Sequence, residues 1–227
     1  MAFYLGSMSV LAIDTCANNC AAAVFTDGGD LLSSIAEDIG RGHAERLNDI
    51  VANALAASSQ CFNDLSKIIV AVGPGSFTGI RVGVAAARGY AIVLGIPVVG
   101  ISTFSLLAAQ ARASGVAGDM LVAFDGGRGQ VFAQRINDWP ASDARPFIIE
   151  RDGSVSISAD TILVGNGGPI VDTQGLRPQY FADRATGNLQ HAFAIAQHAP
   201  MPPEPIYLRK ADAQPSRPVL SFDKDSQ

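Results

Sequence analysis

The sequence predicts an α/β protein built from two related lobes. An apolar run at 68–72 leads into a glycine-rich turn, and the turn opens a long helix that ends before Gly95. Two further apolar strands each end in an aspartate and continue through a turn into another strand. These matching segments are Ile13-Asp14-Thr15 and Phe124-Asp125-Gly126. The strand–helix alternation indicates the α/β class, and the repeated strand ending indicates two lobes.

The composition is that of a globular protein with no strong affinity for nucleic acid. The chain has 227 residues, of which 48% are hydrophobic and 16% charged, so it can bury a core. Its net charge of −5 argues against a basic nucleic-acid surface. Three cysteines do not make a disulfide scaffold, and no signal peptide is recognisable. Arg88 and Pro97 interrupt the most apolar stretch, so we expect a cytoplasmic protein without a membrane span.

The first half of the chain is expected to form five strands and three helices. Asp27-Gly28-Gly29-Asp30 is a typical hairpin turn between two strands. Apolar residues from Leu47 to Leu55 recur at helical spacing. Ser76 or Thr78 is expected to cap the long helix, and Ser102 the next one. The expected strands are 9–13, 20–26, 31–36, 68–72 and 97–100, and the expected helices are 43–58, 78–94 and 102–113.

The second half is expected to contain strands, one helix and an extended tail. The strands are 120–124, 130–136 and 161–164, the helix is 186–199, and 139–160 shows no regular pattern. Proline-rich 200–205 is a rigid link before the short apolar element 206–209. We expect residues 1–7 to be an extension or a leftover of cloning. The predicted domains are an N-terminal lobe at 8–113, a smaller C-terminal lobe at 114–200, and a C-terminal segment with a loose tail at 201–227.

The long helix carries a stripe of very small side chains. Glycine or alanine occurs at every fourth position from Gly79 to Gly95, so these residues share one face. Such a stripe lets another backbone approach closely. It can pack on the chain's own sheet or dock another subunit, and spacing alone favours the first interpretation.

The glycine-rich turn lacks the residues that three enzyme motifs need. A phosphate-binding P-loop requires a lysine after its last glycine, and this turn has none. A nicotinamide fingerprint requires a glycine where Thr78 stands and a later acidic residue, yet no Asp or Glu lies between Asp64 and Asp119. A nucleophile elbow requires glycines where Pro74 and Thr78 flank Ser76. The turn is therefore predicted to be architectural.

Several stretches of the chain resemble the TsaB family, also called YeaZ. The most specific is the run from Gly73 to Gly83, Gly-Pro-Gly-Ser-Phe-Thr-Gly-Ile-Arg-Val-Gly. The resemblance covers most of the chain and is weak only between about 139 and 161. The other matching stretches are Leu11-Ala12-Ile13-Asp14-Thr15, His43-Ala44-Glu45-Arg46-Leu47, Gly100-Ile101-Ser102-Thr103, Phe124-Asp125, Gly129-Gln130-Val131-Phe132 and Glu204-Pro205-Ile206-Tyr207-Leu208-Arg209.

This resemblance implies a fold, a role and a set of partners. The family has the two-lobed fold of actin, sugar kinases and heat-shock ATPases, with a mixed sheet and helices in each lobe. It supplies a non-catalytic subunit for the transfer of a threonylcarbamoyl group to the adenosine next to a tRNA anticodon. The catalytic partner is TsaD, the ATPase TsaE joins the complex, the subunit alone forms a homodimer, and tRNA contact is indirect. The implied interface residues are His43, Arg46, Leu47, Ile50, Gly79, Arg81, Val82, Gly83, Ala86, Ala87 and Tyr90.

The catalytic features of related proteins are incomplete in this sequence. The metal pair His-x-x-x-His of the TsaD relatives is broken because Leu47 follows His43 at that spacing. No metal or cofactor is therefore expected. Remnants of phosphate loops leave room for weak nucleotide binding, with the candidate residues Asp14, Thr15, Asp125, Gly126, Gly127, Gly165 and Gly167.

Three alternative functions stay open at this stage. One is a glycoprotease-type peptidase, and another is a weak nucleotide-binding ATPase or small-molecule kinase. The third is direct tRNA binding by basic residues, for which the candidates are Arg81, Arg88, Arg209, Lys210 and Arg217.

Overall fold

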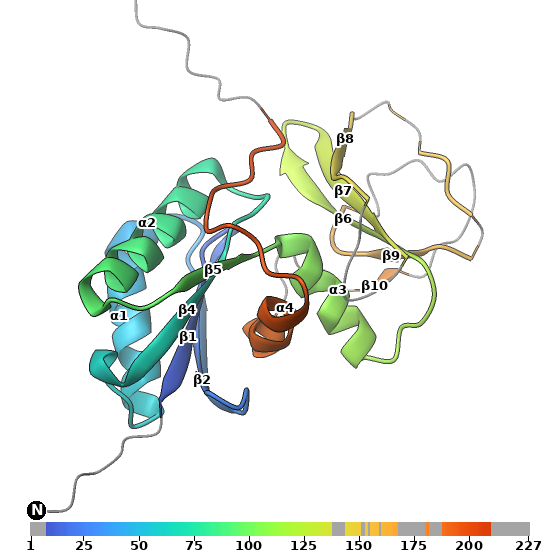
Figure 1. Ribbon diagram of the computed structural model, residues 1–227. Helices are drawn as coiled ribbons and strands as arrows, with labels where there is room; N and C mark the ends of the chain where they lie inside the picture. The colour runs from blue at the N-terminus through green and yellow to red at the C-terminus, as the bar shows by residue number, and fades with distance from the viewer. Residues whose placement is uncertain are drawn as a thin grey trace, which may run out of the picture.

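The protein contains two five-stranded sheets joined by one helix and by a returning C-terminal segment (Figure 1). This computed structural model describes residues 8–137, 144–150, 153, 155–158, 160–167, 180–181 and 188–209. The predicted N-terminal extension (1–7) and loose tail (210–227) lie outside the described residues. The two sheets and their helices confirm the two-lobed α/β architecture that the sequence predicts.

The first sheet has the strand order β3-β2-β1-β4-β5. Its central strand β1 pairs antiparallel with β2 and parallel with β4, and β4 pairs parallel with β5. Every residue of β1 is buried, as expected of a strand covered on both faces. The strand bounds are β1 (Ser9–Asp14), β2 (Asn19–Thr26), β3 (Leu31–Asp38), β4 (Leu65–Ala71) and β5 (Val98–Ile101).

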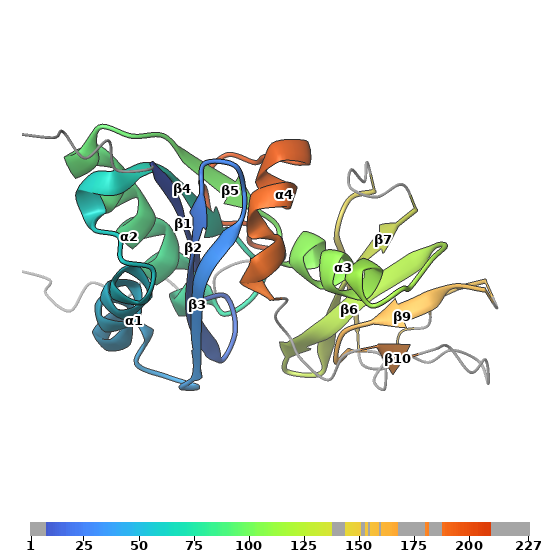
Figure 2. The ribbon, with the colours of Figure 1, turned by 90° about the horizontal axis from the view of Figure 1, so that it is seen from below.

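Helices cover both faces of the first sheet (Figure 2). Helices α1 (His43–Ala57) and α2 (Phe77–Leu94) lie on one face, and α4 (Ala192–His198) lies on the other. The short helices η1 (Phe62–Asp64) and η3 (Leu189–His191) precede β4 and α4. Since α1 and α2 each bury one side only, their outer sides form a continuous surface of the lobe.

The second sheet has the strand order β10-β9-β6-β7-β8. The Phe124 ring of β6 makes an edge contact with Phe132 of β7 and a tilted contact with Phe104, with ring centroids 5.9 and 5.1 Å away. These rings form the centre of a second hydrophobic core. The bounds are β6 (Met120–Gly127), β7 (Gln130–Ile136), β8 (Phe147–Ile149), β9 (Ile162–Val164) and β10 (Tyr180–Phe181).

Helix α3 (Thr103–Ala113) lies between the two sheets and belongs to both cores. Leu106 and Ala109 pack in the first core, whereas Phe104 and Leu107 pack in the second. The helix is apolar nearly all round because it is buried on two sides. It therefore forms a shared wall between the lobes.

The local signals in the sequence predicted most elements correctly. Ser76 caps α2 by accepting a hydrogen bond from the Gly79 amide at 3.3 Å, and Ser102 caps α3 by accepting one from the Phe104 amide at 3.2 Å. Gly95 ends α2 in the left-handed conformation with φ of 66°. These caps confirm the predicted helix boundaries.

Two predictions about the second half of the chain are wrong. The stretch predicted to be irregular contains β8, a three-residue edge strand that is too short to show alternation and exists through its pairing with β7. The helix that the sequence assigned to the C-terminal lobe is α4. Its residues Ala192 and Ile195 pack in the first core, as does Leu189 just before it. Sequence order alone does not reveal that the chain returns to the first sheet. The predicted residues 186–187 of this helix lie outside the described residues.

Candidate protein-binding face

The small-residue stripe of α2 faces inward from Gly79 to Ala91, as its spacing favoured, so the docking role that the resemblance implied for this stripe is wrong. Gly79, Gly83, Ala87 and Ala91 are all buried within the first lobe. A Cβ atom on Gly79 or Gly83 would come closer than 3.0 Å to Thr15. Thr15 also donates a hydrogen bond from its hydroxyl to the Gly79 carbonyl at 2.7 Å. The close approach that the stripe permits is therefore used by the chain's own loop after β1.

Three predicted interface residues of α1 are also turned inward. His43 is 7% exposed, and its Nε2 donates a hydrogen bond to the Ala17 carbonyl at 2.8 Å. Leu47 and Ile50 are almost fully buried in the first core, although the edge of Leu47 still reaches the surface. The helical period that places His43 and Leu47 on one face places that face against β2 and β3.

The outer sides of α1 and α2 enclose an apolar groove of about 530 Å³. The predicted interface residues Val82, Ala86 and Tyr90 line it and are half-buried. Val93, at its end, is 85% exposed, and the neighbouring Ile92 is 80% exposed. Large apolar side chains with this exposure are typical of an interaction site. The remaining lining residues are Ala44, Leu47, Asn48 and Gly89.

Sequence reasoning missed four of the lining residues, although a signal for them exists. Ala44, Asn48, Gly89 and Val93 were not among the predicted interface residues. On α2, Val82, Ala86, Gly89 and Val93 recur at spacings of four, three and four, which defines a second small or apolar stripe. The predicted interface followed the resemblance and included the every-fourth-residue stripe, which faces inward.

A polar pair and an aromatic pair hold the groove in shape. The Tyr90 hydroxyl donates a hydrogen bond to Asn48 Oδ1 at 2.5 Å and so joins α2 to α1. The Tyr90 ring also stacks on Phe62 with centroids 5.2 Å apart. Burial raises the pKa of Tyr90, which keeps the phenol protonated as a donor. The groove is thus a fixed feature of the lobe.

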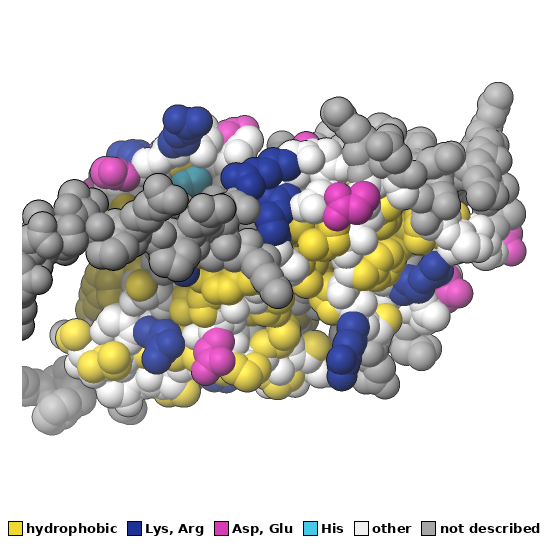
Figure 3. All heavy atoms as spheres, turned by 90° about the horizontal axis from the view of Figure 1, so that it is seen from above, with side chains coloured by type: hydrophobic (Ala, Val, Ile, Leu, Met, Phe, Trp, Pro, Cys, Tyr) yellow, Lys and Arg dark blue, Asp and Glu magenta, His cyan; other side chains and the backbone are white. Residues whose placement is uncertain are grey.

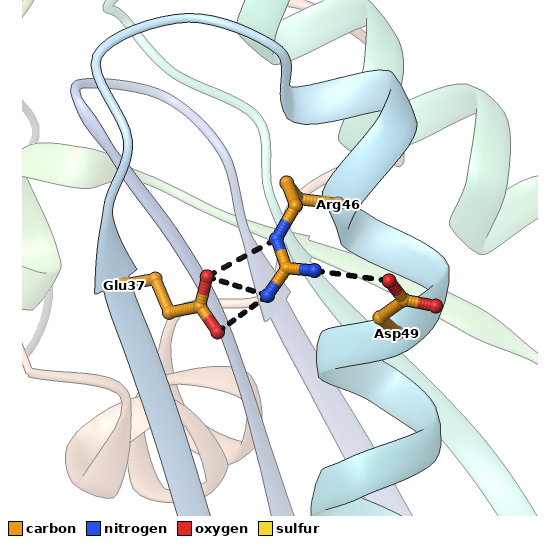
Figure 4. Close-up of polar contacts among 3 residues, drawn as sticks. All are labelled: Glu37, Arg46 and Asp49. Carbon is orange, nitrogen blue, oxygen red and sulfur yellow. Dashed lines mark hydrogen bonds and ion pairs between the residues drawn. The ribbon is translucent and has the colours of Figure 1, made fainter.

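Arg46 lies in an ion-pair network on the other side of α1 (Figure 4). Its Nη2 is 2.8 Å from Glu37 Oε1, and its Nη1 is 3.0 Å from Asp49 Oδ2. The hydrogen bonds that Arg46 donates to Glu37, and the charge of that carboxylate, raise the pKa of Arg46. The guanidinium has two acidic partners and ties α1 to β3 through Glu37, so it does not line the groove, and its role at an interface stays a prediction.

Arg81 lies in an exposed cluster at the start of α2, outside the groove. Its Nε donates a hydrogen bond to the Tyr207 hydroxyl at 2.8 Å. Its guanidinium lies over the Phe77 ring, 3.7 Å from the centroid, and the Phe77 and Tyr207 rings are 4.8 Å apart. This cluster connects α2 to the C-terminal segment.

The first predicted nucleotide loop is closed by α2. Asp14 is 2% exposed, and its Oδ1 accepts a hydrogen bond from the Cys16 amide at 2.8 Å. A Cβ atom on Gly75 would come closer than 3.0 Å to the Cys16 carbonyl. Thr15 is therefore engaged with α2, and Asp14 is buried and bonded within its own loop.

The second predicted nucleotide loop is also engaged in internal contacts. Asp125 Oδ1 accepts a hydrogen bond from the Gly127 amide at 2.7 Å, and Asn166 Oδ1 accepts one from the Asp125 amide at 3.0 Å. Gly165 and Gly167 have no room for a Cβ atom beside Ala123 and Phe124. The structure brings the loops at Asp125–Gly127 and Gly165–Gly167 together, but no hydrogen bond among the described residues joins them to Asp14 or Thr15.

Replacing Asp14 by asparagine is expected to stabilise the protein at neutral pH. Burial raises the pKa of Asp14 above its ordinary value of 3.8, and the bond from Cys16 offsets this only in part. As the pH rises above 3.8, Asp14 ionises in the unfolded chain before it ionises in the folded protein. The free energy of unfolding therefore falls with rising pH, and an asparagine, which does not titrate, avoids this loss. The measurement is urea denaturation from pH 3 to pH 8. A gain that did not shrink toward low pH would contradict the assignment.

The described part of the chain shows no metal site, and one of its helices is long and apolar enough to span a membrane. No group of three or more His, Cys, Asp or Glu side chains among the described residues is placed to hold a metal ion. Helix α2 is long and apolar enough to cross a bilayer by length and composition, but a third of it is buried inside the protein. Its inner side packs on β4 and β1.

Comparisons with known proteins agree with this architecture. The family described as TsaD, tRNA N6-adenosine threonylcarbamoyltransferase, matches residues 34–141. The tRNA threonylcarbamoyladenosine biosynthesis protein TsaB of Escherichia coli K12 is 30% identical over 168 residues, covering 70% of this chain and 72% of that protein. The TsaB protein of Bacillus subtilis 168 is 35% identical over 127 residues, covering 55% of this chain and 53% of that protein.

A solved structure shows the same fold over nearly the whole chain. The structure of YeaZ from Pseudomonas aeruginosa has a TM-score of 0.73 and 26% identity, covering 88% of this chain and all of that chain. The fold and the apolar groove thus define a two-lobed α/β protein with a surface suited to binding another protein. The chain belongs to the TsaB (YeaZ) family.

Proposed function

We propose that this chain is the non-catalytic TsaB-type subunit of a tRNA threonylcarbamoyladenosine biosynthesis complex. In this role it binds a TsaD-type transferase through the groove between α1 and α2, and a TsaE-type ATPase joins the complex. The transferase attaches the threonylcarbamoyl group to the adenosine beside the anticodon. The same groove pairs two copies of the chain when the transferase is absent.

The observation that carries the proposal is the exposed apolar groove between α1 and α2. A fixed groove lined by Val82, Ala86, Tyr90 and Val93 offers a helix of a partner a place for its apolar side chains. The strong exposure of Ile92 and Val93 is costly in water and is relieved when a partner covers them.

A non-catalytic role is supported by the way the two loops are used. Thr15 is packed against α2, Asp14 is buried and bonded to the Cys16 amide, and the glycines at 165 and 167 are packed against β6. Basic side chains are scattered among hydrophobic and acidic ones on the face seen from above, instead of forming one continuous stripe (Figure 3). This distribution supports tRNA contact through the complex instead of by this chain alone.

Reconstitution with purified components tests the proposal. We expect the chain alone to add no threonylcarbamoyl group to tRNA, and the chain plus the TsaD-type transferase of the same organism, with an adenylate donor, to form the modified adenosine. The readout is mass spectrometry of the digested nucleosides. The transferase alone is the control. Modified adenosine formed by the chain alone, or an equal yield without the chain, would refute the proposed role.

The alternative of a weak ATPase or kinase is tested by calorimetric titration with ATP and Mg²⁺. We expect no site of micromolar affinity, because the loop at Asp14 is closed by α2 and the carbonyls of Gly126 and Gly127 bind Arg209. Metal analysis of the same sample tests the peptidase alternative. A nucleotide site of micromolar affinity would favour the ATPase or kinase alternative over the proposed non-catalytic subunit.

A further inference from the structure

We propose that the segment from Met201 to Arg209 is a latch that fixes the angle between the two lobes. The segment leaves the end of α4, runs along the first sheet and ends on the turn between β6 and β7 (Figure 1). It is held by main-chain bonds in the first lobe and by one arginine in the second. This inference does not depend on which partner the groove binds.

The first half of the latch is bound to the first sheet. The amide and carbonyl of Met201 exchange hydrogen bonds with Gly100 at 2.9 and 2.8 Å. The Ile206 amide donates a hydrogen bond to the Val72 carbonyl at 2.8 Å. The side chains of Met201 and Ile206 pack against the first core. These contacts cover the edge of β5 and leave the segment little freedom.

In the second half of the latch, the contacts pass from the first lobe to the second within two residues. Leu208 packs against the second core, whereas Ile206 packs against the first. Between them, Tyr207 accepts the hydrogen bond from Arg81 at the start of α2. The chain therefore crosses from one core to the other at Tyr207, at a point fixed to the first lobe.

Arg209 fastens the end of the latch to the second lobe. Its Nε donates a hydrogen bond to Gln130 Oε1 at 2.7 Å, and its Nη2 donates to the carbonyls of Gly126 and Gly127 at 3.0 and 2.9 Å. The guanidinium also lies 5.7 Å from the centroid of the Phe132 ring. A planar fork that binds three acceptors at once fixes orientation as well as distance, which a lysine cannot do.

Within the described residues, the latch is an attachment between the lobes that is separate from helix α3. With α3 alone, the second sheet could rotate about the helix, since a single packed element permits shear or hinge motion. A second attachment at Arg209 removes that rotation. The protein thereby presents the two lobes as one rigid body.

A distance measurement between the lobes tests the latch. Cys61 is exposed in the first lobe, and Asp160→Cys adds an exposed site in the second. Spin labels on these two thiols report the interlobe distance by pulsed electron spin resonance. Cys16 and Cys20 stay unlabelled because they are buried, and burial raises the pKa of both thiols, that of Cys20 to about 11. We expect Arg209→Gln to widen the distance distribution.

Hydrogen exchange in the same variant reports the local attachment. We expect the amides of Asp125 and Gly127 to exchange at least about tenfold faster, because charge-assisted hydrogen bonds that hold the turn are lost. Arg112→Gln is the matched control, since Arg112 binds two carbonyls, those of Val116 and Gly118, in the loop that follows its own helix. It should leave the interlobe distance unchanged.

Each outcome decides for or against the latch. A wider distribution in Arg209→Gln and an intermediate one in Arg209→Lys support it. Faster exchange at Asp125 and Gly127 with an unchanged interlobe distance would overturn it, because Arg209 would then be a local brace of the turn. If Arg209→Gln does not fold, Tyr207→Phe is the second variant, because it removes only the hydrogen bond from Arg81. An interlobe distance that is unchanged in both Tyr207→Phe and Arg209→Lys would then overturn the proposal.

Discussion

Gly79→Ala is expected to lower the free energy of unfolding by about 3 kcal/mol, the upper end of the usual cost of forcing a methyl group into a packed site. The added Cβ would come closer than 3.0 Å to the backbone carbonyl of Thr15, which cannot swing away as a side chain would. Alanine is the better helix former by about 1 kcal/mol, but this gain is smaller than the cost of the clash. The measurement is urea denaturation followed by circular dichroism.

Gly89→Ala is the matched control on the same helix. A Cβ atom on Gly89 meets no atom within 4 Å, so the helix preference acts alone. We expect this variant to be more stable than the parent protein by about 0.5–1 kcal/mol. Equal effects of the two substitutions would contradict the assignment of the inner and outer sides of α2.

Ala86→Arg is expected to weaken binding of the proposed TsaD-type partner by roughly 30-fold or more, which corresponds to a loss of about 2 kcal/mol at an interface hot spot. Ala86 lies at the middle of the groove, half-buried between Val82 and Tyr90. An arginine there fills the groove and places a charge without a partner in a buried apolar contact. The measurement is calorimetric titration with the transferase, and self-association of the chain should fall with it in sedimentation.

Ala85→Arg is the control for this experiment. Ala85 is the preceding residue of α2, it is exposed, and it does not line the groove. The two variants have the same composition and the same charge. Affinity that survives in Ala86→Arg, or is lost equally in both, would mean that the partner binds elsewhere.

The site could be predicted from the sequence only in part. The resemblance pointed to α1 and α2, and Val82, Ala86 and Tyr90 do line the groove. Gly79, Gly83 and Ala87 were assigned to the same surface, yet they are buried within the first lobe, Gly79 and Gly83 against Thr15. A helical stripe of small residues specifies how closely a neighbour comes and says nothing about whether that neighbour belongs to the same chain.

Local sequence is enough to specify the strand–turn–helix at 68–94, the caps at Ser76 and Ser102, and the end of α2 at Gly95, because these depend on residues close together in the chain. Which side of α2 is free, the return of α4 to the first sheet and the contact of Arg209 with the turn at Gly126 follow from the folded chain. These features depend on contacts between residues 64 or more positions apart, such as Thr15 with Gly79 and Arg209 with Gly126. Periodicity records which residues share a face, whereas the folded chain alone determines what that face meets.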